Sequence, residues 1–269
     1  MKKGTLMEII DLHCHVYPQK IASKAAGAIG DFYNIKMPFD GTPESLLNEG
    51  EEAGVTRFVV HSVATTARQV DSINAFLSEQ ASLYPQFIPF MTLHPDMTER
   101  EINSAVDAGI KCGFRGIKLH PDFQKFHADG KECFYMCAAA EGRIPILFHA
   151  GDDRYDYSSP ERIVRAANAF PHLTVIAAHF GAYKQWEKVP YYAQNRNIFF
   201  DTSSSLYYLE RETAKRFIRT FGAERFMFGT DYPMWSAADE IRRIKDLNLS
   251  EEEEALIFHK NAEKLLGLK

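Results

Sequence analysis

Eight short apolar runs recur along the chain, each followed by a helical pattern or by a segment long enough to hold a helix. The runs are 8–13, 57–63, 87–93, 114–119, 145–149, 173–178, 197–201 and 225–229. Nearly continuous apolar runs are typical of parallel strands that are covered on both faces. The alternation therefore predicts an α/β fold, a single (β/α)8 TIM barrel over residues 1–269. An open doubly wound sheet is disfavoured, because no G-x-G-x-x-G or P-loop motif follows any run.

Four of the intervening segments open with residues that favour the start of a helix. Two place Ser or Thr directly before a proline, and two place Ser or Thr three residues before a glutamate. The pairs are Thr42–Pro43, Ser159–Pro160, Thr98–Glu101 and Ser250–Glu253. The first strand–helix connection, 16–41, is long, and we expect it to hold a lid or a short helix over the barrel mouth.

Composition and charge restrict the partners of the chain. Its 269 residues carry a net charge of -5 without a basic cluster, which predicts no binding to nucleic acid or to an anionic membrane surface. No apolar run reaches the roughly 18 residues that span a bilayer, and we expect no signal peptide in "MKKGTLMEIIDLH". The four cysteines form no C-x-x-C pair, so we expect reduced, buried thiols in a cytoplasmic protein.

Histidines gather at one end of the predicted strands. Seven of the ten histidines end a strand run or follow it directly: His13, His15, His61, His94, His120, His149 and His179. The last run leads into "FGTDYP", which places Asp231 at the same level. Any one of these histidines alone is more simply explained as a capped or solvated residue. Seven at the mouth of one barrel, where such folds carry their chemistry, predict a functional site.

The residue types favour a metal ion. His13 and His15 are two apart on a strand, so they share one face and Cys14 points to the opposite face, toward the surrounding helices. With an imidazole from the fifth strand and the carboxylate of Asp231, they would form a three-histidine, one-aspartate set with an open position. Ligand softness favours zinc, with manganese next. A bound divalent ion lowers the pKa of water to about 7; Asp231 would then accept the proton and His179 would assist.

The ordered motifs "DLHCH", "GIKLHP", "ILFHAG", "VIAAHFGA" and "FMFGTDYP", with the closing "NAEKLLGL", resemble the amidohydrolase superfamily. Within it the chain is most similar to the amidohydrolase-2 branch, which includes aminocarboxymuconate-semialdehyde decarboxylase and γ-resorcylate decarboxylase. The likeness runs from the first strand to the last helix. It implies one divalent metal on His13, His15, His149 and Asp231, and a role for His179 on substrate or water.

Lys118 and His120 share one strand face and have more than one interpretation. In binuclear members of the superfamily a lysine on the fourth strand is carboxylated and bridges two metals. Lys118 could instead hold a substrate carboxylate as an ammonium, or pair with an acid of the barrel. The resemblance to a branch with one metal favours substrate contacts for both residues.

Further side chains are candidates for the site because they follow the predicted strands. Arg154, in the loop after the fifth strand, is a candidate to bind a substrate carboxylate. Asp201, Ser203 and Ser204 are candidates to orient a histidine or touch substrate. Trp186 and Trp235 are candidates for apolar pocket walls. His61 and His94 are expected to form hydrogen bonds in the mouth, and His259 is expected to have no catalytic part.

Four functions are compatible with the sequence. The first is metal-dependent hydrolysis of an ester, lactone or amide of a small organic acid. The second is non-oxidative decarboxylation of an aromatic or unsaturated acid, and the third is a metal-free lactonase. The fourth is a barrel that has lost its chemistry and serves as a binding or scaffold protein. The three enzyme functions predict a small-molecule substrate that bears a carboxylate. A homodimer is expected by analogy with the family.

Overall fold

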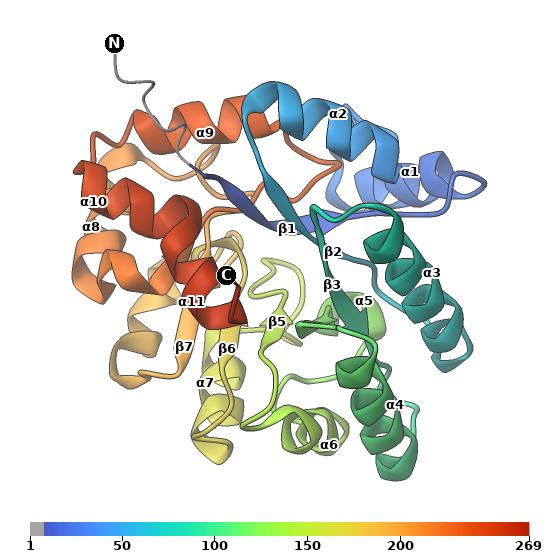
Figure 1. The fold of residues 1–269 in the computed structure, drawn as a ribbon. Coiled ribbons are helices and arrows are strands. Elements are labelled where there is room, and N and C mark those ends of the chain that lie inside the picture. The colour runs from blue at the N-terminus through green and yellow to red at the C-terminus, as the bar shows by residue number, and fades with distance from the viewer. Residues whose placement is uncertain (1–7, 269) are drawn as a thin grey trace.

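A computed structural model describes residues 8–268 and contains the predicted barrel (Figure 1). Its eight strands form one parallel sheet in the order β1-β2-β3-β4-β5-β6-β7-β8. Their bounds are β1 Ile10–His15, β2 Arg57–His61, β3 Phe87–Thr92, β4 Gly116–Leu119, β5 Ile146–Phe148, β6 Val175–Ala177, β7 Ile198–Asp201 and β8 Phe226–Met227. Every predicted strand is confirmed. The first runs two residues further than expected, because it stays paired with β2 as far as His15.

The barrel closes through the segment that follows the short strand β8. Leu12 N donates to Phe228 O at 2.9 Å, and His15 N donates to Tyr232 O at 2.8 Å. Asp231 N donates in return to His13 O at 2.9 Å. The seam between the first and last strands is therefore built by the same residues that carry the candidate site, so closing the barrel also positions Asp231 beside His13.

Helices surround the barrel (Figure 1). Their bounds are α1 Ala22–Tyr33, α2 Pro43–Ala53, α3 Val70–Leu83, α4 Glu99–Lys111, α5 Pro121–Gln124, α6 Lys131–Ala140, α7 Pro160–Ala169, α8 Arg211–Phe221, α9 Ala237–Lys245, α10 Glu251–Ala255 and α11 Asn261–Leu266. Three of the four predicted caps form, at Thr42, Thr98 and Ser250. Ser159 precedes the proline that begins α7 but makes no capping hydrogen bond.

A β-bulge in β1 aims the two histidines. Between the pairs Asp11↔Phe58 and Cys14↔Val60, β1 carries two residues where β2 carries one. The bulge lets Leu12 pack in the barrel interior while His13 also faces the axis. Cys14 packs with Phe58 and Val60 in the outer core against the helices, as predicted.

The two ends of the barrel are covered differently. At one end, Ala262 and Leu266 of α11 pack against the interior residues Leu12 and Ile176. At the other end lies α1, the helix expected within 16–41, whose Tyr33 hydroxyl is 3.1 Å from His120 Nε2. Between residues 8 and 268, no helix is both long and apolar enough to cross a membrane.

Candidate metal centre

His13 lies at the centre of the site and presents an unprotonated nitrogen. Its Nδ1 is 2.8 Å from Asp201 Oδ2, and a carboxylate only accepts, so Nδ1 carries the proton. Nε2 therefore offers its lone pair to the barrel axis. Burial lowers the pKa of His13 to about 4, so the ring is neutral near pH 7, as a metal ligand must be.

His15 and Asp231 direct their polar atoms to the same point. His15 Nε2 is 3.3 Å from His13 Nε2, and Asp231 Oδ1 is 3.3 and 3.4 Å from these two nitrogens. Although burial opposes ionisation, the imidazoles of His13, His15 and His179 hold the pKa of Asp231 well below its usual value. The structure thus brings together three of the four residues predicted to bind the metal, around one ionised carboxylate.

His149 and His179 form a second pair of imidazoles beside this group. His149 Nε2 donates to Gly151 O at 2.8 Å, and His179 Nδ1 lies 3.1 Å from Ser203 O. Both protons are thereby assigned, which leaves two lone pairs facing one another, with His149 Nδ1 3.0 Å from His179 Nε2. Two unprotonated nitrogens at this distance repel one another unless a cation lies nearby. Their lone pairs therefore fit the binding of a divalent ion.

His179 is nearer to the centre than the resemblance implies. Single ligand atoms of His13, His179 and Asp231 lie within 4.8 Å of one another, whereas His149 groups with His120 and Asp122. Asp231, His179 and Ser204 all have positive φ values, of 65°, 62° and 49°. Non-glycine residues in this region are strained, and such strain clusters at functional sites.

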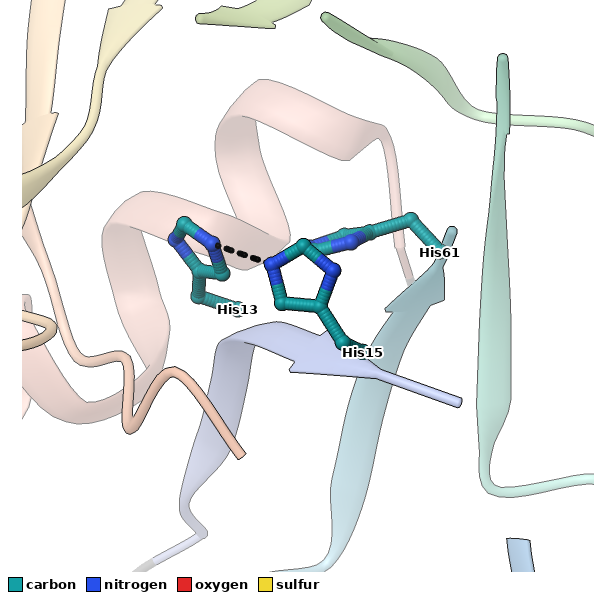
Figure 2. Close-up of side chains that lie close together, drawn as sticks. All are labelled: His13, His15 and His61. Atoms are coloured by element: carbon teal, nitrogen blue, oxygen red, sulfur yellow. Dashed lines mark hydrogen bonds between the residues drawn. The ribbon is translucent and has the colours of Figure 1, made fainter. Parts of the chain in front are cut away.

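His61 is a further imidazole at this end of the barrel, beside His13 and His15 (Figure 2). It comes from the end of β2, with its ring centroid 4.4 Å from that of His15 and 4.9 Å from that of His13. It is fully buried, and neither ring nitrogen has a hydrogen-bond partner among the described residues. The prediction that His61 hydrogen-bonds in the mouth is therefore wrong. For His94 it is confirmed, because His94 Nδ1 accepts from Asp96 N at 3.2 Å.

Polar groups behind the centre fix its geometry. Asp201 Oδ1 accepts from Ser203 Oγ at 2.5 Å and from His179 N at 2.9 Å. Ser204 Oγ donates to Asp231 Oδ2 at 2.5 Å and accepts from Trp235 Nε1 at 2.9 Å. Asp201, Ser203 and Ser204 thus orient the histidines and the aspartate.

Trp186 and Trp235 act through their indole N–H groups and do not line the cavity at the centre. Trp186 Nε1 donates to His179 O at 2.9 Å, and Trp235 donates to Ser204. The expectation that they form pocket walls is therefore corrected. Both partly buried indoles thus find an acceptor beside the site.

Lys118 lies at the centre as the only fully buried lysine of the described residues. Its Nζ is 3.0 Å from His13 Nε2, and burial lowers its pKa to about 8. An ammonium with so few partners is suited to an anionic group of a ligand. It also competes for the lone pair of His13, so an ion bound there would displace this contact.

The candidate ligands line a small cavity, here called the metal chamber, which α1 covers. Among its lining residues are His13, His15, Lys118, His120, His149, His179 and Asp231, and Ile29 and Tyr33 from α1. His120 stacks between Phe123 and His149, with both centroid separations 3.9 Å. Its Nδ1 accepts from Phe123 N, so Nε2–H donates to the Tyr33 hydroxyl at 3.1 Å.

Tyr33 is a chamber residue that the sequence did not single out. Burial raises the pKa of its hydroxyl well above the usual value, so it stays protonated and can donate to a ligand. The only sequence signal was the length of the connection 16–41, which predicted a cover without indicating its polar group.

Arg154 does not line the chamber, in contrast to the expectation of a substrate contact. Its guanidinium donates to both oxygens of Asp152 and, at 2.5 Å, to Phe32 O near the end of α1. It also stacks on the Phe32 ring at 4.2 Å. With its donors used in this way, Arg154 fastens α1 to the β5 loop instead of presenting itself to a substrate carboxylate.

Comparisons with solved structures show the same fold at low sequence identity. An uncharacterised TIM-barrel protein from Bordetella bronchiseptica is 22% identical, with a TM-score of 0.78, and the match covers 97% of this chain and 99% of that one. A dihydroxybenzoic acid decarboxylase from Polaromonas, with bound manganese and 2-nitroresorcinol, is 18% identical over 97% of both chains, with a TM-score of 0.73. A putative 2-pyrone-4,6-dicarboxylic acid hydrolase from Pseudomonas putida is 16% identical over 98% of both chains, with a TM-score of 0.68.

The sequence itself identifies the family. No curated protein matches the chain. The family profile described as amidohydrolase, of the type 2 group, matches residues 10–268, which includes every candidate ligand and nearly the whole barrel. The fold, the ordered motifs and the profile agree, and the chain belongs to the amidohydrolase family.

Proposed function

We propose that the protein is a metal-dependent hydrolase that acts on an ester, lactone or amide of a small organic acid. The observation that carries this proposal is the convergence of the unprotonated Nε2 of His13 and the Nε2 of His15 with the carboxylate of Asp231. His149 is proposed as the fourth ligand through Nδ1, whose lone pair faces that of His179 Nε2. Zinc is the preferred ion by ligand softness. Manganese is the alternative, supported by its presence in the Polaromonas relative.

A divalent ion at this place supplies Lewis acidity and lowers the pKa of water to about 7. The protein's part is to orient groups and to move protons. The carboxylate of Asp231, which Ser204 holds in place, accepts a proton. His179, kept neutral by burial and with Nδ1–H directed to Ser203, offers Nε2 as a base or as a contact to the substrate. Tyr33 and Lys118 supply hydrogen-bond donors to the acyl oxygen or to a carboxylate.

Non-oxidative decarboxylation is the second candidate, and Lys118 is the observation that favours it. A buried ammonium beside His13 and within the chamber can hold a carboxylate or donate a proton to carbon. The Polaromonas relative is a decarboxylase, whereas the Pseudomonas relative is a putative hydrolase. Carbon dioxide release from a panel of aromatic and unsaturated acids, measured beside hydrolysis of lactones and esters, distinguishes the two reactions.

Asp231→Asn tests the shared metal chemistry. The amide keeps the shape but loses the charge and one acceptor, so we expect metal affinity to fall at least about a hundredfold and turnover to be lost. Thermal unfolding should stay cooperative. The matched control is Asp96→Asn. Asp96 follows β3, and its side chain is 77% exposed, so this variant should behave like the wild type. Full turnover by Asp231→Asn, or full activity with less than about a tenth of a metal ion per chain, would contradict the proposal and favour a metal-free lactonase.

A further inference from the structure

The metal chamber is too small for a whole substrate. Its volume is about 20 Å³, which is room for about one water molecule. Small-molecule sites generally occupy ~300–1,000 Å³. If the reacting group of a substrate lies at His13 and Asp231, the rest of the substrate must therefore lie outside the chamber.

A larger apolar groove lies next to the chamber, between α1 and α3. It has a volume of about 460 Å³. Ala25, Ala28 and Ile29 line it from α1, and Ile73 and Phe76 line it from α3. Figure 1 shows the two helices on the same flank of the barrel. No Lys, Arg, Asp or Glu is among the described residues that line the groove, although Ser and Gln side chains contribute at its margin.

The groove and the chamber share part of their walls. His15, Ile29 and Phe123 line both, so the candidate metal ligand His15 itself borders the apolar surface of the groove. Two other cavities border the chamber less closely. One, of about 700 Å³, shares only Phe123 with it and is lined by Asp96, Lys125 and Glu132. The other, of about 450 Å³, shares only Met37.

We propose that this groove, which we call the α1–α3 groove, binds an uncharged apolar extension of the substrate, an alkyl chain or an aryl group. The inference rests on the proposed function, since the reacting carbonyl or carboxyl group would lie in the metal chamber. Ile29 of α1 and Phe123 line both spaces, so the extension would pass beside these two side chains to reach the groove. A charged substituent is disfavoured, because the lining offers no ionic partner and burial of an unpaired charge is costly. The substrate class is therefore esters, lactones or acids that carry an apolar tail.

Binding of straight-chain carboxylates to the cobalt-loaded protein tests the inference without requiring turnover. Acetate, butyrate, hexanoate and octanoate are titrated by calorimetry and by the visible spectrum of the ion. Binding of the carboxylate group reports on the chamber. The dependence of the affinity on the length of the alkyl chain reports on the groove. We expect affinity to rise about threefold to fourfold for each methylene that enters the groove.

Two substitutions on α1 complete the test. Ala28→Phe fills the groove and should abolish the gain with chain length while leaving the affinity for acetate unchanged. Lys24→Phe adds the same ring to an exposed side chain of α1 that lines neither space, and it should keep the gain. Equal affinity for acetate and octanoate in the wild type, or a gain that survives Ala28→Phe, would overturn the inference.

The outcome for the groove is separable from that for the proposed function. Metal content is measured on the same samples, and loss of metal counts against the proposed function alone. Octanoate is also titrated against metal-free protein, where a gain over acetate that Ala28→Phe abolishes would still support the groove. Self-association of the wild type that Ile73→Asp abolishes, without binding of any acid, would show that the groove is an interface between copies and would overturn the inference.

Discussion

Single residues decide which atoms of the site can bind a ligand. The acceptors Asp201, Gly151 and Ser203 each take an N–H from one imidazole, which frees the opposite nitrogen of His13, His149 and His179. Gly151 adopts a φ of 81°, and a Cβ there would lie 2.7 Å from the backbone of Ala182. Only glycine fits this close approach, so the tautomer of His149 depends on a residue without a side chain.

His61 gives a prediction at the same scale. His61→Phe retains a ring against His13 and His15 but removes two buried nitrogens that have no partner among the described residues. We expect the free energy of unfolding of the metal-free protein to rise by about 1 kcal/mol, with metal content unchanged. Chemical denaturation and elemental analysis measure the two quantities.

His94→Phe is the control, because it removes an acceptor that the Asp96 N–H uses. This variant should be destabilised where His61→Phe is not. A marked loss of bound metal in His61→Phe would contradict the expectation and would place His61 among the ligands.

The sequence predicted the residues of the centre better than their partners. Alternation along a strand was enough to place His13 and His15 on one face and Cys14 on the other. It did not reveal that His179 lies as close to His13 and Asp231 as a ligand would, or that both ring nitrogens of His61 lack hydrogen-bond partners among the described residues. Both depend on how the side chains pack at the barrel mouth, which strand periodicity does not encode.

At the scale of elements, α1 determines access to the site. It supplies Tyr33 and Ile29 to the chamber and one wall of the α1–α3 groove. Its C-terminal end is fastened by Arg154, which is held in turn by Asp152. A ligand larger than the chamber enters only if α1 moves or if the Ile29 side chain, which lines both the chamber and the groove, moves aside. The length of the connection predicted a cover, but the fastening joins residues 122 positions apart and has no local pattern.

Arg154→Met tests this fastening. Methionine keeps an apolar stem against Phe32 but loses the donors to Phe32 O and Asp152. We expect amide hydrogen exchange in residues 22–33 to become roughly tenfold faster, since a hydrogen bond from a charged group contributes about 1.5 kcal/mol or more. Exchange in the barrel strands should not change.

Arg165→Met, which removes an exposed arginine that pairs with Asp129, is the comparison and should leave α1 unaffected. Unchanged exchange in α1 of Arg154→Met would show that the helix is held by its apolar contacts alone.

At the scale of the whole molecule, the barrel brings distant residues to one axis. Parallel pairing of β1 through β8 places the ends of all strands on one rim, so His13, His149 and Asp231 meet although they lie far apart in the sequence. This convergence follows from the fold class, and the alternation of apolar runs was sufficient to predict it. The volumes of the chamber and of the groove were not predictable, because they depend on where α1 lies over the barrel mouth and beside α3.

The most direct test of the account is the position of the metal. Crystals of the zinc-loaded or manganese-loaded protein, measured at the absorption edge of the ion, give an anomalous difference map. We predict one peak per chain, about 2.0–2.3 Å from His13 Nε2, His15 Nε2, His149 Nδ1 and an oxygen of Asp231. A peak among His120, Asp122 and His149, or no peak in protein that is catalytically active, would contradict the central claim.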